Sequence, residues 1–274
     1  MKTKQNLFFM AFLAMITLLP INAYAQENLG MPASRYYENA KNGDPEAQYE
    51  LALCYLNGLG VEVDYAEAFE LALKSAQQSF PLGTALVGDI LENGLGREKN
   101  TKNAHTIHGK VVSQSMPLIS DVDLAVEVLT EALQVIEDQA AYVYNKTWRQ
   151  SRNDNTDPRA LYALYYIFIN GKGVPTNENE AFKLLRLSAK SGYAKAQNTL
   201  GLYYAESNDE ESQNTAVQLF NNAAEQGNED AMWNLACAYK EGKGVKKDIS
   251  KANYWLQKAA ENGQPEAIEA LSNE

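Results

Sequence analysis

The sequence predicts an all-α protein, a right-handed α-solenoid of antiparallel helix pairs with about 36 residues per repeat. The first observation is a small residue that recurs at the start of similar segments: Ala47, Gly83, Ala160, Ala196, Ala231 and Ala267. The steps between these positions are 36, 77, 36, 35 and 36 residues, and the long step fits two units plus a few residues. The second observation is a Gly-x-Gly phrase that follows several of these residues, as at Gly58 and Gly60.

Each unit contains two expected helices. The first runs from the small residue to the aromatic residue eight positions later, as from Ala47 to Tyr55, with apolar residues at plus four and plus eight on one face. Glycine ends this helix, because it takes a left-handed turn without steric cost. The second helix begins at a polar cap such as Asp64 or Asp248 and ends at a glycine such as Gly263. One pair cannot cover its own apolar face, so the units must stack.

Residues 1–25 have the three parts of a secretory signal peptide. Lys2 and Lys4 form a positive region, residues 7–19 are almost entirely apolar, and Ala23-Tyr24-Ala25 is a small-x-small cleavage site. The alternative is a membrane anchor, which needs about 20 apolar residues. We therefore expect cleavage before Gln26, no membrane insertion after cleavage, and a periplasmic or secreted protein.

The mature chain divides into four further parts. Residues 26–46 are expected to form an N-terminal capping helix, residues 47–111 two helical repeats, and residues 158–274 helical repeats with a C-terminal cap. Residues 112–157 depart from the repeat, because an apolar stripe there predicts one long amphipathic helix or a distorted helical pair, followed by a polar loop. This part is either a degenerate repeat that completes the stack or an inserted docking element, with Trp148 as a contact residue to test.

The most complete unit lies near the C-terminus. Residues 231–263 follow Ala-x-x-x-Leu-Gly-x-x-Tyr-x-x-Gly-x-Gly-Val-x-x-Asp-x-x-Lys-Ala-x-x-Trp-x-x-Lys-Ala-Ala-x-x-Gly, with Ala236 at the first glycine. This pattern resembles the Sel-one-like repeat family, which is related to the tetratricopeptide repeat. Residues 47–80 and 160–192 are also similar to it, whereas 196–227 and 83–111 match less fully. The resemblance implies a helical superhelix whose members usually act as binding scaffolds.

Composition and motifs argue against several classes of function. The 35 acidic and 24 basic residues leave a net charge of −11, which repels the phosphates of nucleic acids. No serine has lysine three positions later, and no Gly-x-Ser-x-Gly elbow is present. Tyr166 and Cys237 occupy the place where a phosphate-binding loop needs its first glycine. We therefore expect neither catalytic nor cofactor-binding residues.

The two histidines and two cysteines are the residues that could bind a metal or form a disulfide. His105 and His108 lie three apart, so on a helix they could hold one edge of a metal site, but no third ligand is apparent. We expect two surface histidines and no metal. Cys54 and Cys237 belong to distant units, so we expect free, buried thiols rather than a disulfide.

A groove lined by the first helices is the expected binding surface. Its candidate partner-binding residues are the aromatic residues at the plus-two and plus-six positions: Tyr49, Tyr162, Tyr166 and Trp233. The alternative role for these side chains is packing between repeats. The excess of acids indicates a partner protein with a basic surface, or is explained by solubility alone.

The expected function is a non-catalytic protein–protein interaction scaffold of the bacterial envelope. It would act as a regulatory adaptor, or as an inhibitor or immunity protein that binds another protein in its concave groove. A secreted virulence factor that meets a host protein is a third use that the residues leave open. The alternatives are a cell-wall-acting enzyme and a peptide or glycan carrier.

Overall fold

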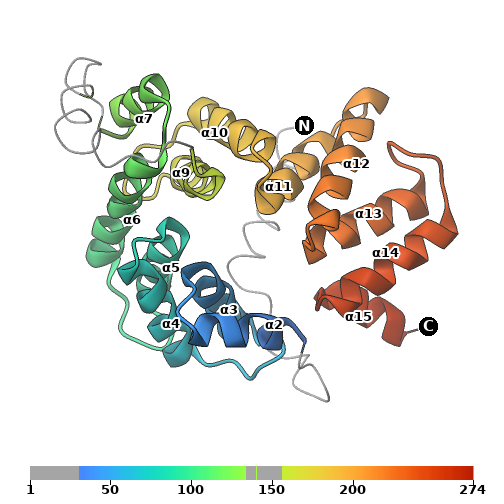
Figure 1. Cartoon of the computed structure of the whole chain (residues 1–274), viewed down its shortest axis with the longest axis horizontal. Helices are drawn as coiled ribbons and strands as arrows, with labels where there is room; N and C mark the ends of the chain where they lie inside the picture. The colour runs from blue at the N-terminus through green and yellow to red at the C-terminus, as the bar shows by residue number, and fades with distance from the viewer. Residues whose placement is uncertain (1–30, 134–139, 141–155, 274) are drawn as a thin grey trace.

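The computed structural model describes residues 31–133, Ala140 and residues 156–273. Over these residues the chain is helical, with turns between the helices and no strand. Figure 1 shows successive helix pairs arranged around a curve, with α3, α5, α9 and α11 toward its hollow side. The predicted all-α solenoid is confirmed. The predicted signal peptide and Trp148 lie outside the described residues.

Within the described residues, helix pairs form the body of the curve and single helices lie near its ends. The pairs are α3 (Pro45–Asn57) with α4 (Tyr65–Gln77), α5 (Pro81–Asn93) with α6 (Thr101–Ser115), α9 (Pro158–Asn170) with α10 (Glu178–Lys190), α11 (Ala194–Ala205) with α12 (Glu210–Glu225), and α13 (Glu229–Glu241) with α14 (Ile249–Glu261). The end helices are α2 (Met31–Lys41) and α15 (Pro265–Ser272). A 3-10 turn, η1 (Met116–Leu118), and α7 (Val122–Leu133) follow α6. None of the described helices is long and apolar enough to span a bilayer.

The helix ends have the polar caps and glycines that the sequence predicts. Asp44 accepts a hydrogen bond from the amide of Ala47 at the start of α3, and Asp64 accepts from two amides at the start of α4. Four first helices end at a left-handed glycine with φ between 64° and 78°: Gly58, Gly94, Gly171 and Gly242. The exception is α11, which ends at Glu206 where the Gly-x-Gly phrase is replaced.

The small residues that mark the repeat are buried where helices cross. Ala160, Ala196, Ala231 and Ala267 have no exposed surface. At Gly83 a Cβ would lie 2.3 Å from the hydroxyl of Ser75, so no larger residue fits without a shift. The small side chains therefore allow the close approach of neighbouring units that stacking requires.

The unit α9–α10 stacks directly on α5–α6. Helix α9 contacts both α5 and α6, and a Cβ on Gly173 would lie 2.6 Å from the amide nitrogen of Gly109 in α6. Gly244 makes the equivalent close approach to Gln213 of α12 in the next part of the stack. No helix pair of residues 116–133 therefore lies between these two units, although α7 shares their hydrophobic cluster through Leu129. Helix α7 lies on the outer side of α10, where Glu127 forms an ion pair with Lys183 (Figure 1).

Candidate functional site

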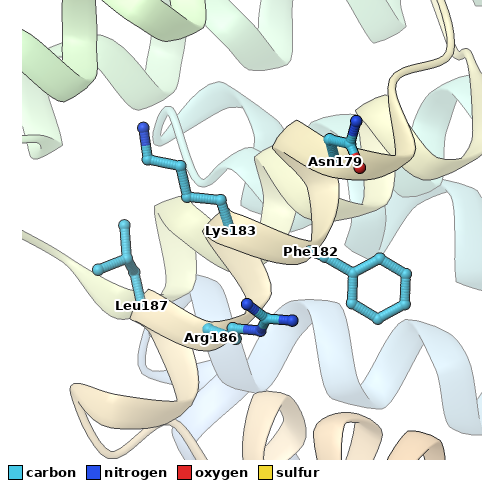
Figure 2. A pocket seen from close by; sticks show the side chains of 5 residues that line it. All are labelled: Asn179, Phe182, Lys183, Arg186 and Leu187. Carbon is cyan, nitrogen blue, oxygen red and sulfur yellow. The ribbon is translucent and has the colours of Figure 1, made fainter.

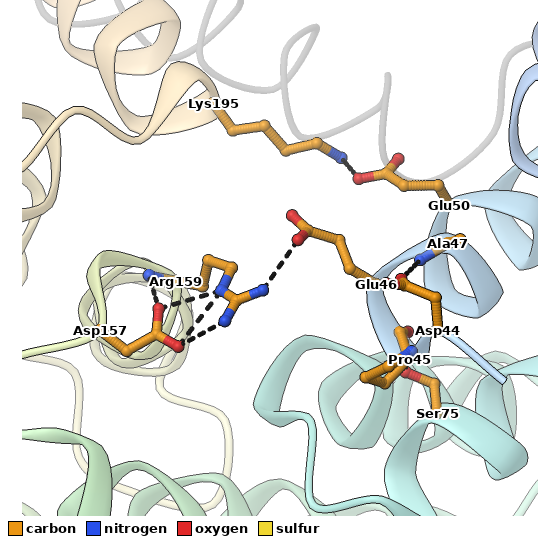
Figure 3. Close-up of polar contacts among 9 residues, drawn as sticks. All are labelled: Asp44, Pro45, Glu46, Ala47, Glu50, Ser75, Asp157, Arg159 and Lys195. Carbon is orange, nitrogen blue, oxygen red and sulfur yellow. Dashed lines mark hydrogen bonds and ion pairs between the residues drawn. The ribbon is translucent and has the colours of Figure 1, made fainter. Parts of the chain in front are cut away.

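Side chains from the first helices meet across the curve, and together they form what we call the inner face. Its members are Glu46, Tyr49, Glu50, Arg159, Tyr162, Lys195, Glu229 and Asp230. The Nζ atom of Lys195 on α11 lies 2.6 Å from Oε1 of Glu50 on α3, although these helices belong to units that are not adjacent in the stack. Figure 3 shows the Lys195 side chain extended toward α3, with Arg159 directed toward Glu46.

Two ion pairs connect opposite parts of the inner face. Burial raises the pKa of Glu50 above its ordinary value, although its ion pair with Lys195 acts in the opposite direction. Burial alone would lower the pKa of Lys195, yet Glu50 and neighbouring tyrosines hold it well above its ordinary value. Arg159 lies 2.9 Å from Glu46 and 2.8 Å from Asp157, so α3 is also connected to α9. These contacts fix α3 relative to α9 and α11.

Carboxylates outnumber the basic side chains of the inner face. Glu229 and Asp230 lie in the first turn of α13, and Glu266 lies in the first turn of α15. Burial and the charge of Asp230 raise the pKa of Glu229. Within the described residues, neither Glu229 nor Asp230 lies within ion-pair distance of a lysine or arginine. Lys195 and, for Glu229, Arg35 act on these carboxylates only through their charge, without a direct ion pair among the described residues.

Three of the candidate partner-binding tyrosines lie half-buried between helices. Tyr49 packs against Phe80 with ring centroids 6.0 Å apart, and the Nζ of Lys195 lies 5.0 Å from the Tyr49 ring. The hydroxyl of Tyr162 lies 3.1 Å from that of Thr199. Tyr166 donates a 2.6 Å hydrogen bond to Asp89. These contacts show packing between repeats, and partner binding by the same side chains stays a prediction.

Trp233, the fourth candidate, is partly buried on α13. It packs against the C-terminal hydrophobic cluster, which includes Met232 and Leu235. Its place in the first helix matches the prediction, whereas a role in binding stays untested.

A polar cluster that the sequence does not predict joins α5, α6 and the end of α9. Asp89 accepts hydrogen bonds from Tyr166 and Lys172 and lies 3.1 Å from Nε2 of His108. Burial alone would raise the pKa of Asp89, but His108 and Lys172 together hold it below its ordinary value. Lys172 also donates to Glu92 at 3.1 Å. The cluster fixes α9 on the preceding unit.

One of the two histidines, His108, belongs to this cluster. The prediction that both histidines lie on the surface is wrong for His108, which is fully buried, whereas His105 is exposed. The imidazole occupies space beside Gly88, because a Cβ at Gly88 would lie 2.3 Å from Nε2. Ligand atoms of Asp89, Glu92 and His108 lie within 4.8 Å of one another, a spacing that a metal ion could use. The ammonium group of Lys172 is bonded to both carboxylates, so it takes the place that a cation would take.

The cysteines and a surface depression are two further features. Cys54 and Cys237 are free; Cys54 is buried as expected, whereas Cys237 is only half-buried, so its expectation as a buried thiol is wrong. Burial raises the pKa of Cys54 to about 12, so its thiol is unreactive at neutral pH. Figure 2 shows a depression on α10 lined by Asn179, Phe182, Lys183, Arg186 and Leu187. Phe182 in this depression packs on Tyr203 with ring centroids 4.4 Å apart.

Repeat matches identify the family of this protein. Sel1 repeats match residues 45–80, 81–105, 158–193, 194–228 and 229–264, which together exceed half of the chain. The chain belongs to the Sel1 repeat family. Sel1 repeat proteins generally serve as protein-interaction scaffolds and are typically non-catalytic.

Among curated proteins, relatives occur in bacteria and yeast. An uncharacterized protein of Neisseria meningitidis serogroup B, NMB1327, is 28% identical over 174 residues, which cover 62% of this chain and 34% of that protein. Chitin synthase regulatory factors 3 and 2 of Schizosaccharomyces pombe are each 26% identical, over 86% and 81% of this chain and 26% and 45% of their own lengths. The Sel1 chain thus spans less than half the length of these relatives.

Solved structures with similar helical repeats come from several bacteria. A Sel1 repeat protein from Oxalobacter formigenes is 24% identical, with 88% of this chain and 86% of that chain covered and a TM-score of 0.46. The immunity protein Pa5087 from Pseudomonas aeruginosa is 17% identical, with coverages of 89% and 79% and a TM-score of 0.44.

Proposed function

We propose that this Sel1 repeat protein is a non-catalytic interaction scaffold of the bacterial envelope whose inner face binds a partner that presents basic side chains. The observation that carries the proposal is the pair of carboxylates Glu229 and Asp230, which no lysine or arginine of the described residues contacts directly and which lie near the half-buried Tyr36 and Tyr162. Opposite charge favours encounter with a basic partner, and aromatic side chains add contact area at low entropic cost.

Lys195 is an internal example of the recognition that we propose. Its ammonium group rests on the Glu50 carboxylate and near the Tyr49 ring, so one cationic side chain already uses a carboxylate and an aromatic ring of this surface. A lysine or arginine of a partner would find similar surroundings beside Glu229 and Asp230.

The location and the biological role are also part of this proposal. The features of residues 1–25 support export to the periplasm or the medium. In the envelope the scaffold would serve as a regulatory adaptor, or as an inhibitor that binds another protein as an immunity protein does.

The first experiment is an affinity purification of the tagged protein from native envelope extract, with mild crosslinking and mass spectrometry. We expect one stoichiometric protein partner whose recovery falls as salt is raised, because exposed charges are screened. Recovery of peptidoglycan fragments or sugars without a protein would contradict the scaffold and favour the carrier or the cell-wall enzyme.

A charge-neutral variant tests which surface is used. The double change Glu229→Gln and Asp230→Asn keeps side-chain shape, and we expect about tenfold weaker partner binding, equal to about 1.4 kcal/mol. The matched control is Glu70→Gln, which removes an exposed carboxylate from the outer helix α4 and leaves the inner face intact. Equal loss in both variants would show a non-specific charge effect.

A further inference from the structure

The N-terminal helix α2 contacts turns that are remote in sequence. The guanidinium of Arg35 donates to the carbonyl oxygen of Gly227 at 3.1 Å and to Oδ1 of Asn262 at 3.4 Å. These partners lie 192 and 227 positions further along the chain, in the turn between α12 and α13 and the turn after α14. The helix therefore bridges the first unit and the last units of the curve.

Pro32 makes the closest approach at this bridge. A Cβ on Gly263 would lie 2.1 Å from Cγ of Pro32, so the proline ring rests on the glycine backbone. A Cβ on Gly227 would lie 2.9 Å from Nη2 of Arg35. We call these interactions, made by Pro32 and Arg35 with Gly227, Asn262 and Gly263, the closing contact.

The surroundings of Tyr36 agree with this placement of α2. Burial is the largest cause that raises the pKa of the Tyr36 hydroxyl, and the charges of Glu50 on α3 and Glu229 on α13 raise it further. Tyr36 thus lies within electrostatic reach of both sides of the inner face. The remaining packing of α2 is mainly against α3.

The closing contact is small compared with the packing inside each unit. Arg35 is exposed, so its hydrogen bonds compete with water and stabilise the closed form only modestly. Helix α2 packs on α3, and α3 carries Glu46 and Glu50, which pair with Arg159 and Lys195. Movement of α2 and α3 together would therefore break the ion pairs that cross the inner face.

We propose that α2 is a releasable clasp: the closing contact holds the curve shut, and its release opens the inner face to a partner. The part about the partner rests on the proposed function, whereas the closing contact itself does not. Release would break the internal ion pair between Lys195 and Glu50, and basic groups of the partner would then contact the carboxylates of the inner face.

A series of glycine substitutions tests the clasp with a matched control. Gly192, Gly227 and Gly263 end equivalent second helices with φ of 91°, 89° and 90°, so alanine brings similar backbone strain at each. No atom of the described residues lies within 4 Å of a Cβ at Gly192, whereas Arg35 lies close to a Cβ at Gly227 and Pro32 to one at Gly263. Only Gly227→Ala and Gly263→Ala therefore press on α2.

The readout is the distance between spin labels on α2 and α14, at the exposed positions Asn39 and Asn253, with both native cysteines replaced by alanine. We expect one narrow distance distribution for the parent protein and for Gly192→Ala. Gly263→Ala should shift the distribution to longer distances, with Gly227→Ala between them. The same distribution in Gly263→Ala and Gly192→Ala, or a broad one in the parent, would overturn the clasp.

A binding measurement separates the clasp from the proposed function. A decalysine peptide is the probe, and we expect it to associate with Gly263→Ala at least about threefold faster than with Gly192→Ala, because access no longer awaits opening. Equal rates would overturn the role of the clasp in access. Absence of peptide binding by every variant would contradict the basic partner, while the label distances would still decide the closing contact.

Discussion

At the scale of single residues, Ser79 has a backbone conformation that glycine has in the equivalent turns. Its φ is 62°, and Gly43, Gly192, Gly227 and Gly263 have positive φ at the same place in their units. A residue with a Cβ in the left-handed region costs about 1–2 kcal/mol of stability. Glycine removes this strain but loses more chain entropy on folding, which costs about 0.5–1 kcal/mol. We expect Ser79→Gly to stabilise the protein by about 0.5–1 kcal/mol in urea unfolding.

The reverse substitution is the control for this expectation. Gly192→Ser introduces the same strain at a site where the part of the chain that the structure describes has no atom within 4 Å of the new Cβ, so steric contact does not obscure the result. It should destabilise the protein by a similar amount. No change in either variant would show that the φ at Ser79 carries no strain.

The raised pKa of the Glu180 carboxyl leads us to expect that the stability of the protein depends on pH. This carboxyl is buried in the first turn of α10, and its Oε1 has no hydrogen-bond partner among the described residues. Burial, aided by the charge of Glu131, raises its pKa to about 7. Because the folded-state pKa is raised, the native state binds the proton more tightly, and stability falls as pH rises from about 4.5 to 7. Glu180→Gln should match the parent melting temperature at pH 4.5 and exceed it at pH 8.

The exposed Glu178 on the same helical turn provides the control for Glu180. Glu178→Gln removes the same charge without changing a buried group, so it should not produce the same pH-dependent gain. A gain for Glu180→Gln that is equal at pH 4.5 and pH 8 would show that its carboxyl does not titrate as expected.

At the scale of elements, the contact between α5 and α6 depends on a glycine, Gly88, which leaves space for a side chain of the facing helix. Gly88 leaves room for His108, which pairs with Asp89 and thereby supports the bond to Lys172 from the next unit. Gly88→Ala should destabilise the protein by about 1–3 kcal/mol, because a methyl group overfills this buried site. The measurement is the midpoint of urea unfolding, with unfolding followed by the tyrosine fluorescence.

Gly109 on the facing helix α6 is the matched control. The nearest atom to a Cβ there is 3.9 Å away, an ordinary contact. Gly109→Ala should therefore be neutral or stabilise the helix by up to about 1 kcal/mol. A loss of the same size at Gly88 and Gly109 would contradict the specific role of the His108 site.

The elements themselves were largely predictable, whereas their contacts across the stack were not. Polar caps, left-handed glycines and small residues act locally, so spacing alone identified the helix pairs. Asp89 and Tyr166 both occupy plus-six positions, and they meet only because α9 stacks directly on α5 and α6. Spacing could not show this, since residues 112–157 were long enough to contain another unit.

At the scale of the whole molecule, curvature results from small rotations that add up over many units. The sequence therefore predicted a stack without predicting that Arg35 would reach Gly227, or Lys195 would reach Glu50. The candidate tyrosines were placed on the first helices as expected, but their neighbours depend on that accumulated curvature. The aromatic residues were recognisable from their spacing, and the ion pairs between opposite units were not.

The hydrophobic interior predicts that unfolding is not uniform. The buried apolar residues of the described chain form three clusters, over residues 33–90, 80–200 and 216–267, so the first and the last are separated by the second. Repeat proteins are stabilised mainly by contacts between neighbouring units, so damage at one end is transmitted weakly to the other. Leu235→Ala removes a fully buried side chain from the second cluster and should cost about 2–5 kcal/mol there.

Hydrogen exchange under native conditions measures the local stability of each helix directly. In Leu235→Ala we expect faster amide exchange in α12 to α15, with α3 to α6 retaining most of their protection, because the closing contact is too small to couple the two ends strongly. Leu51→Ala, in the first cluster, should produce the opposite distribution. Equal loss of protection at both ends in either variant would mean that the curve unfolds as one cooperative body, and that the closing contact contributes far more than its exposed hydrogen bonds indicate.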